Sequence, residues 1–264
     1  MAAVWGRPLQ GPKVPRVTPA FWLIKGLSTA FGEATSDFSV HHGNPYLAVM
    51  AGALGFLVAF ALQWSARRYV AWRYWLLVVM VAVFGTMVAD VLHVVVGVPY
   101  AWSTAMFAVL LTAVFVGWYR KEGTLSIHAI NTRRREAFYW AAVVATFAMG
   151  TATGDMTAVA FHWGYLRSGL IFACLFALAL VARWAGAHPV LAFWAAYVLT
   201  RPLGASFADW FGKPVALGGL GYGDGAVAGV LALPIVGLVA AVSVGRLDAP
   251  REAPAGVQPE SSGG

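Results

Sequence analysis

WLLVVMVAVFGTMVAD, residues 75–90, is the stretch that decides the fold, because its spacing of tryptophan, glycine and aspartate occurs four times in the chain. The other copies are WLIKGLSTAFGEATSD (22–37), WAAVVATFAMGTATGD (140–155) and WAAYVLTRPLGASFAD (194–209). In every copy a glycine follows the tryptophan by 10 residues and an aspartate follows it by 15. The shared positions are Trp22, Trp75, Trp140 and Trp194, then Gly32, Gly85, Gly150 and Gly204, and last Asp37, Asp90, Asp155 and Asp209. This agreement without gaps predicts an internal repeat, and we call the helix expected over each copy a motif helix.

The composition indicates that these helices lie in a membrane. Of the 264 residues, 60% are hydrophobic and 11% are charged, against roughly 25% charged residues in a typical soluble domain. Apolar runs long enough to cross a bilayer, about 17–25 residues each, recur along the chain. They predict transmembrane helices over residues 20–39, 46–64, 73–92, 103–119, 137–157, 166–184, 189–209 and 224–244. We therefore expect an all-α fold, a polytopic integral membrane protein of eight transmembrane helices, because barrel strands alternate and are shorter.

Each repeat is expected to pair a motif helix with a plainer second helix. Two crossings per unit make all four motif helices point the same way, so the repeats are parallel. The expected domains are an N-terminal cytoplasmic tail (1–17), the transmembrane domain (18–246) with repeats at about 18–66, 67–120, 136–185 and 188–246, and a disordered cytoplasmic tail (247–264). The repeats form either a pseudo-fourfold bundle or two pseudo-twofold halves, and both arrangements stay open.

Basic residues set the expected topology. They gather in the N-terminal tail and in every second connection: Arg7, Lys13, Arg16, Arg67, Arg68, Arg73, Arg120, Lys121, Arg133, Arg134, Arg135, Arg183, Arg246 and Arg251. The opposite connections hold only Arg167 and Lys213. By the positive-inside rule both termini are cytoplasmic. The net charge of +7 is then a topology signal and no sign of a nucleic-acid partner. The lipid bilayer and a small solute or cation are the expected partners, and the oligomeric state stays open.

The four tryptophan–glycine–aspartate units resemble a known family, together with the phrases EGTLSIHAINTRRREAFYW (122–140) and FWAAYVLTRPLGASFADW (193–210). The family consists of bacterial inner-membrane proteins built from four copies of a two-helix "repeat of unknown function" with a characteristic tryptophan. They are often labelled uncharacterised membrane-anchored proteins. The resemblance covers about residues 13–246. It implies a fold and a place in the bacterial inner (cytoplasmic) membrane, but no established activity, so function has to be argued from the residues.

A polar stripe runs along each motif helix. At about 100° per residue, the positions 7, 11 and 15 residues after the tryptophan share its face. The stripe holds Lys25, Thr29, Glu33, Ser36 and Asp37 in the first repeat, Thr86 and Asp90 in the second, Thr151 and Asp155 in the third, and Tyr197, Arg201 and Asp209 in the fourth. Carboxylates facing lipid would be costly, so the four stripes are expected to meet inside the bundle. The tryptophans are expected at the cytoplasmic interface, roughly 22 Å from the aspartates along each helix.

The four aspartates have two interpretations. They form an acidic ring that holds or passes a cation, or each one ends its helix and accepts hydrogen bonds from turn amides. Duplication copies structural residues as well as functional ones, so the fourfold occurrence does not decide between these interpretations. The glycines are expected to permit close helix approach, with a hinge as the alternative.

Three charged residues depart from the repeat template. Glu33 replaces a threonine or alanine of the other repeats, and Lys25 replaces a valine or tyrosine. Arg201 lies about one helical turn from the height of Glu33, and the first and fourth repeats become neighbours if the ring closes. Structural pairing and function are both open for these groups. Pro202 is expected to kink the motif helix of the fourth repeat, as in many transporter sites.

The remaining motifs carry less information. His41, His42, His93 and His162 form a possible outer collar for a metal ion such as Mn²⁺ or Zn²⁺, but the metal stays unknown. The glycine-rich GGLGYGDG (218–225) follows no strand, so it predicts a flexible loop rather than a dinucleotide site. No cofactor is expected, and no Ser–His–Asp spacing, HExxH or P-loop supports an enzyme.

Two functions from different classes follow from these patterns. The first is a secondary transporter or channel-like permease for a small solute, with a cation as the expected cargo. Its pathway is Glu33, Asp37, Asp90, Asp155, Asp209, Lys25 and Arg201. The second is a non-transporting membrane scaffold or stress-related sensor whose polar stripes only bind the helices together.

Overall fold

The computed structural model describes residue 9 and residues 11–250 of the chain. Its long elements are α2 (Pro19–His42), α3 (Pro45–Ser65), α4 (Ala71–Asp90), α5 (Tyr100–Glu122), α6 (Arg133–Asp155), α7 (Tyr165–Trp184), α8 (Pro189–Gly212) and α9 (Asp224–Gly245). Two π-helical turns, η1 (Val91–Val95) and η3 (Met156–Ala160), and two 3₁₀ turns, η2 (Ile127–Ala129) and η4 (Val215–Leu217), complete the described elements. No β-strand occurs in this part of the chain, and the expected all-α fold is confirmed.

Local sequence signals set several helix starts. Thr18 caps α2 by accepting a hydrogen bond from the Phe21 amide, and Pro19 occupies the first turn. Asn44 and Pro45 do the same for α3, where the Asn44 side chain accepts from the Tyr46 and Leu47 amides. Such caps satisfy amides that have no partner within the helix, and proline loses nothing in the first turn.

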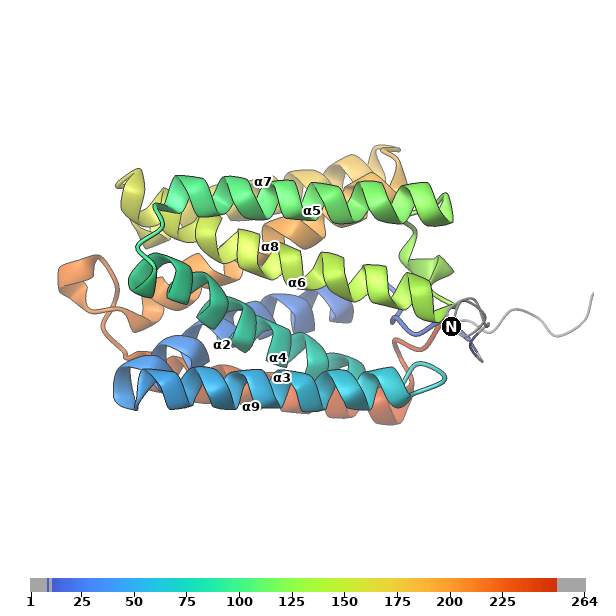
Figure 1. Ribbon diagram of the computed structural model, residues 1–264, viewed down its shortest axis with the longest axis horizontal. Coiled ribbons are helices and arrows are strands. Elements are labelled where there is room, and N and C mark those ends of the chain that lie inside the picture. Colours follow the sequence, from blue (N-terminus) through green and yellow to red (C-terminus); the bar gives the residue numbers. More distant parts are fainter. Residues whose placement is uncertain (1–8, 10, 251–264) are drawn as a thin grey trace, which may run out of the picture.

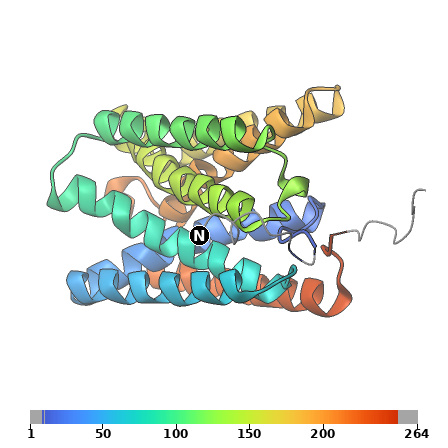
Figure 2. The same ribbon diagram turned by 45° about the vertical axis from the view of Figure 1, so that its right-hand side comes forward.

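The helices divide into an inner and an outer set. Figure 1 shows α3 and α9 along one side and α5 and α7 along the opposite side, with α2, α4, α6 and α8 between them, and Figure 2 agrees. In the apolar stretches of α4, α6 and α8, 56%, 67% and 56% of the residues are buried, against 11–22% in α3, α5, α7 and α9. The inner helices are the motif helices, so the polar stripes lie inside the bundle.

Seven helices, α3 to α9, are long and apolar enough to cross a membrane. The element α2 is not among these seven, and it is the motif helix that carries Lys25, Glu33 and Asp37. Large apolar side chains on the outer helices are exposed, for example Leu57 on α3 and Leu233 on α9. A surface of this kind fits a multi-pass membrane protein, since lipid covers it.

The motif helices contact one another in a closed ring. Helix α2 packs against α4 and α8, and α6 packs against the same two helices. Each outer helix packs against the motif helix that follows it in the chain, α3 on α4, α5 on α6 and α7 on α8. The last outer helix, α9, packs against the first motif helix, α2. The outer helix of each repeat therefore packs against the motif helix of the next repeat, and the outer helix of the fourth repeat packs against the motif helix of the first.

Both described ends of the chain lie at the same end of the bundle, which we call the terminal end (Figure 1). The Arg16 amide donates a hydrogen bond to the Asp248 carbonyl (2.8 Å), and the Lys13 amide donates to the Ile130 carbonyl (3.2 Å). Lys13 and Val14 are buried, and so is Asp248. Residues 11–17, expected to form a tail, thus pack onto the bundle because loop carbonyls and Glu136 bind them. Most of the expected C-terminal tail, residues 251–264, lies outside the described residues.

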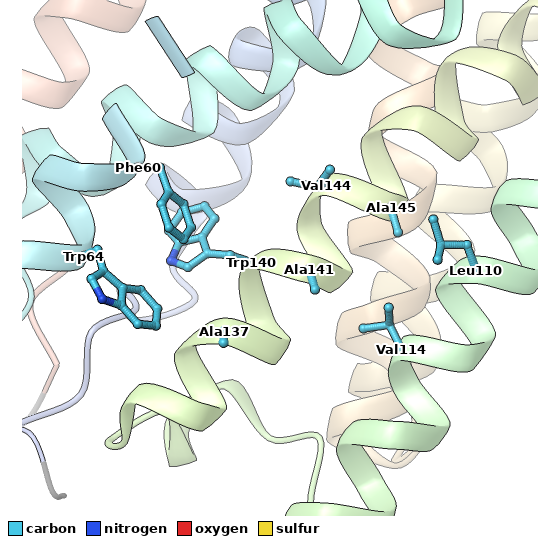
Figure 3. A pocket seen from close by; sticks show the side chains of 9 residues that line it. All are labelled: Phe60, Trp64, Leu110, Val114, Ala137, Trp140, Ala141, Val144 and Ala145. Atoms are coloured by element: carbon cyan, nitrogen blue, oxygen red, sulfur yellow. The ribbon is translucent and has the colours of Figure 1, made fainter. Parts of the chain in front are cut away.

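An apolar groove of about 400 Å³ lies between α3, α5 and α6. Figure 3 shows Phe60 and Trp64 of α3 beside Trp140 of α6, with Leu110 and Val114 of α5 on the far side. Its lining contains no charged residue.

Candidate functional site

The carboxylates of the four motif helices meet in one pocket, which we call the acidic pocket. It has a volume of about 650 Å³ and lies at the end of the bundle opposite the terminal end. Its lining includes Glu33, Asp37, Asp90, Asp155 and Asp209, which come from α2, α4, α6 and α8. Lys213, His41, Tyr46, Tyr100 and Tyr165 also line it. All five acids of the expected pathway thus share one cavity.

The four aspartates do not occupy equivalent places in their helices. Asp90 and Asp155 are the last residues of α4 and α6, and a π-helical turn follows each of them. Asp37 and Asp209 lie inside α2 and α8, which continue to His42 and Gly212. The α-helical geometry therefore ends at Asp90 and Asp155 but not at Asp37 and Asp209, and among residues 11–250 no turn amide donates to the carboxylates of Asp90 and Asp155. Single π-turns inside helices occur often at functional sites.

Lys213 is the basic residue of the acidic pocket. Its Nζ lies 2.5 Å from Asp37 Oδ2, 3.9 Å from Asp209 Oδ1 and 4.0 Å from Asp224 Oδ2. Burial lowers the pKa of Lys213, but Asp37 and Asp209 outweigh this and raise it above its ordinary value. Lys213 therefore stays an ammonium ion.

The glycine-rich loop after α8 holds Lys213 in place. The Gly221 amide donates to the Lys213 carbonyl (2.9 Å), and the Leu220 amide donates to the Trp210 carbonyl (2.6 Å). A Cβ on Gly219 would lie 2.1 Å from the Lys213 carbonyl oxygen, so only glycine fits there. The loop expected to be flexible is thus hydrogen-bonded back onto the end of α8.

Arg201 joins all four motif helices directly behind the pocket. Its Nη2 lies 2.6 Å from Glu33 Oε2 on α2 and 2.6 Å from Thr151 Oγ1 on α6, and it also contacts Thr86 Oγ1 on α4. Arg201 is fully buried within α8, and Glu33 is 3% exposed. Glu33, Thr86 and Thr151 occupy the same repeat position, 11 residues after the tryptophan. The Arg201 guanidinium fills the place where the fourth repeat has Ala205.

Glu33 keeps one oxygen free for the pocket. The hydrogen bonds from Arg201 and from Thr86 (3.2 Å) both end on Oε2. Among residues 11–250 no hydrogen bond or ion pair ends on Glu33 Oε1, and none ends on the carboxylates of Asp90 and Asp155. The pocket therefore contains acceptors that no protein donor occupies.

The four shared glycines lie where the motif helices come closest. A Cβ on Gly32 would lie 2.3 Å from Ala82 Cβ, and one on Gly85 would lie 3.2 Å from Phe147 Cβ. One on Gly150 would lie 2.5 Å from Arg201 Cγ, and one on Gly204 would lie 2.0 Å from Thr29 Oγ1. Each glycine thus faces the residue that stands 7 positions after the tryptophan of the next repeat, and the fourth faces the first. This is the geometry expected for close helix approach.

Lys25 and Pro202 do not line the acidic pocket. Lys25 is fully buried, with its Nζ 4.1 Å from the centre of the Phe147 ring and 4.5 Å from that of Tyr197. It precedes Glu33 by 8 residues, or about 12 Å of helix, and the two rings enclose its amino group at cation–π distances. Pro202 lies inside α8, where its Cδ would be 3.0 Å from a Cβ on Gly150.

The motif tryptophans are mostly buried, and they do not form the interfacial belt expected from the sequence. Trp75, Trp140 and Trp194 are 1%, 3% and 5% exposed, while Trp22 is half-buried. Two of them donate their indole hydrogens to connections at the terminal end. Trp75 Nε1 donates to Asp248 Oδ2 (3.2 Å), and Trp194 Nε1 donates to the Leu125 carbonyl (3.0 Å). Together with Tyr74, Tyr139 and Tyr197 they form what we call the aromatic layer.

A metal ion would find one set of ligands here. Oxygens of Glu33, Asp37 and Asp209 lie within 4.8 Å of one another. These are the acids that already bind Arg201 and Lys213. Of the four histidines considered for an outer collar, His41 alone lines the acidic pocket.

Lys213 is the pocket residue that the sequence interpretation missed. It follows Asp209 by four residues, so it continues the polar face of the fourth motif helix by one turn. Tyr100 and Tyr165 carried no recognisable signal, because they come from the starts of two outer helices.

The comparisons with known proteins concern the repeat. No curated protein and no solved structure matches the chain. A family model described as Repeat of Unknown Function matches residues 73–124, 138–187 and 192–246. These segments contain the second, third and fourth motif helices, while the first repeat, with Lys25 and Glu33, lies outside them. The chain therefore belongs to the Repeat of Unknown Function (DUF347) family.

Proposed function

We propose that the chain is a secondary transporter or channel-like permease for a small cation, with the acidic pocket as its binding site. One observation carries the proposal: five carboxylates from four helices line a cavity of about 650 Å³, and within residues 11–250 the ion pairs to them come from Lys213 and Arg201. Ionisable groups in a membrane bundle are expensive, and they mark ion and substrate pathways. An excess of carboxylates with free oxygens favours a positively charged cargo.

In this mechanism Glu33 is the central group. Arg201 and Thr86 hold its Oε2, which fixes the carboxylate and leaves Oε1 toward the pocket. In this mechanism Glu33 Oε2 holds the helices together through Arg201 and Thr86, and Glu33 Oε1 binds the cargo. In this mechanism the aromatic layer and residues 11–17 lie between the acidic pocket and the terminal end, and the cargo enters the pocket from the acidic end.

A scaffold or sensor without transport is the second candidate, and the Arg201 contacts favour it. One guanidinium group links four helices through Glu33, Thr86 and Thr151. Buried charge networks of this kind can specify helix register without any ligand. The scaffold hypothesis assigns no task to the free oxygens of Asp90 and Asp155.

Uptake into proteoliposomes tests the proposal. We expect purified protein in lipid vesicles to move either Mn²⁺ or 1,4-diaminobutane, measured by fluorescence quenching or radiolabel. Asp155→Asn should reduce this flux by at least about tenfold, because the carboxylate lines the pocket and has no protein partner to stabilise. Glu33→Gln should abolish the flux.

The matched control is Glu122→Gln, which removes an equal charge at the terminal end, where Glu122 pairs with Arg134 and Arg135. It should leave flux unchanged. Wild-type levels of uptake in a folded Asp155→Asn protein would contradict the transport mechanism. Absence of uptake in the wild type, together with loss of folded protein in Arg201→Met, would favour the scaffold.

The membrane arrangement completes the proposal. We infer eight crossings, in which α2 spans the bilayer as one of the four helices of the ring, and a pseudo-fourfold rather than a pseudo-twofold arrangement. The cyclic order of the four glycine contacts supports this. We also propose that the terminal end faces the cytoplasm of a bacterium, since the basic loops gather there.

A further inference from the structure

The lining of the acidic pocket is chemically mixed. Beside the carboxylates it contains apolar side chains from several elements: Val40, Val49, Met50, Met87, Val91 and Val159. Tyr46, Tyr100 and Tyr165 add aromatic rings. A volume of about 650 Å³ falls in the range of roughly 300–1,000 Å³ typical of sites for organic molecules. A bare metal ion uses only its oxygen ligands, at about 2.0–2.6 Å, and has no use for an apolar wall.

Lys213 shows which chemical group the carboxylates already accept. Its side chain is a primary ammonium on a four-carbon stem, and Asp37 Oδ2 binds that ammonium at 2.5 Å. The carboxylates of Asp209 and Asp224 lie farther from this nitrogen, at 3.9 and 4.0 Å. The protein thus holds an alkylammonium ion of its own within the acidic pocket. Methionine and tyrosine side chains adapt well to flexible apolar or cationic ligands.

Two carboxylates next to this internal ammonium remain open. Asp90 and Asp155 line the pocket, and within residues 11–250 neither accepts a hydrogen bond or an ion pair. Glu33, which is 3% exposed, adds the free Oε1. Asp90 on α4 and Asp155 on α6 are therefore open to a second ammonium group, while Lys213 keeps Asp37 on α2 and Asp209 on α8.

We propose that the cargo is an organic ammonium ion, whose charged group binds the carboxylates of the acidic pocket that Lys213 leaves open, Asp155 first among them, and whose apolar body lies against the valine and methionine side chains. This inference rests on the proposed function and names its substrate class. A divalent metal ion would instead use Glu33, Asp37 and Asp209, the three acids with suitable spacing. To bind there it has to displace Lys213 from Asp37.

Calorimetry on the full-length protein in lipid nanodiscs tests the substrate class. The probes are 2-phenylethylamine, its uncharged analogue 2-phenylethanol, and MnCl₂, each titrated also into empty nanodiscs to subtract partitioning. We expect saturable binding of the amine, with no saturable binding of the alcohol. Asp155→Asn should weaken amine binding at least about tenfold, and Glu122→Gln should not change it.

A second variant keeps the test informative if Asp155→Asn does not fold. Lys213→Met removes a positive charge from the pocket and frees Asp37, so it should tighten amine binding several-fold. Amine binding that is equal in wild type, Asp155→Asn and Lys213→Met would overturn the inference. Saturable Mn²⁺ binding that depends on Asp37 or Asp209, without amine binding, would overturn the substrate class and leave cation transport standing. Binding of neither probe and uptake of neither cation would remove the proposed function as well.

Discussion

The two ends of the same four motif helices handle charge in opposite ways. At the terminal end every buried charge described above has a partner: Lys13 binds Glu136 and the Gln63 carbonyl (2.8 Å), and Asp248 accepts from Tyr69 (2.5 Å) and Trp75. At the acidic end five carboxylates line a cavity with Lys213 as the one lysine or arginine among its lining residues. Paired groups under loops stabilise a fold, whereas carboxylates without an ion pair in a cavity, here Asp90 and Asp155, cost stability. We therefore propose that the terminal end serves stability and the acidic end serves binding.

The largest expected difference in unfolding free energy is between two acid-to-amide changes in α6, one at each end of the bundle. Glu136→Gln at the terminal end leaves the buried Lys13 ammonium without its carboxylate, and we expect a loss of about 3–5 kcal/mol of unfolding free energy. Asp155→Asn at the acidic end removes a carboxylate that has no protein partner, so stability should stay equal or rise. Denaturant unfolding in mixed micelles measures both changes. Equal losses in the two variants would show that the ends do not differ in this way.

The ring of motif helices could be predicted from the sequence because its determinants are local and repeated. Three residue types at fixed offsets placed the glycines, the aspartates and the polar faces, and the boundaries of the predicted helices agree closely with those observed. Pairing of Arg201 with Glu33 was one of the interpretations that the sequence left open, and the two side chains are in contact where the fourth motif helix meets the first. Position within a repeat therefore carried most of the information about the inner helices.

The parts that could not be predicted depend on chain segments outside the repeat. Burial of Trp75 and Trp194 results from Asp248 and the Leu125 carbonyl, which lie in connections with no repeating pattern. Lys25 shares a helical face with Glu33, yet Phe147 and Tyr197 enclose it away from the acidic pocket. Helical periodicity predicts the direction in which a side chain points. It does not predict whether aromatic rings of neighbouring helices separate that side chain from the pocket.

Two glycine substitutions in α2 are expected to change stability by an intermediate amount. They compare a close helix contact in the middle of the bundle with an open position on the same helix. Gly32→Ala forces its Cβ to within 2.3 Å of Ala82 Cβ and 2.7 Å of the Ala82 carbonyl carbon, so the helices have to separate. We expect a loss of about 1–3 kcal/mol, as for overpacked cores. Gly26→Ala is the control, because a Cβ there meets no atom within 4 Å.

The control should be neutral or stabilise the protein by up to about 1 kcal/mol, since alanine is the better helix former. Thermal unfolding of both variants in the same detergent measures the difference. If Gly32→Ala is as stable as Gly26→Ala, the ring is looser than the contacts indicate, and close approach does not explain the repeated glycine.

The smallest effect is the pH dependence of the unfolding free energy that Lys13 contributes at the terminal end. Burial lowers the pKa of Lys13 from its ordinary value of 10.5 to about 8, although Glu136 opposes this shift. Between these two pH values the unfolded chain binds one more proton at Lys13 than the native protein does, so stability rises with pH through this window. The slope from this single group is at most about 1.4 kcal/mol per pH unit. Below about pH 8 both states are protonated, and the contribution does not change.

Comparison with Lys13→Met isolates this slope, because every other titrating group is present in both proteins. We expect the unfolding free energy of the wild type, minus that of the variant, to grow between about pH 8 and 10.5. Parallel unfolding experiments in micelles at several pH values measure it. A difference that stays constant or falls with pH would mean that Lys13 is solvated in the native state. Residues 11–17 would then not seal the terminal end, and the contrast with the open acidic end would lose its structural basis.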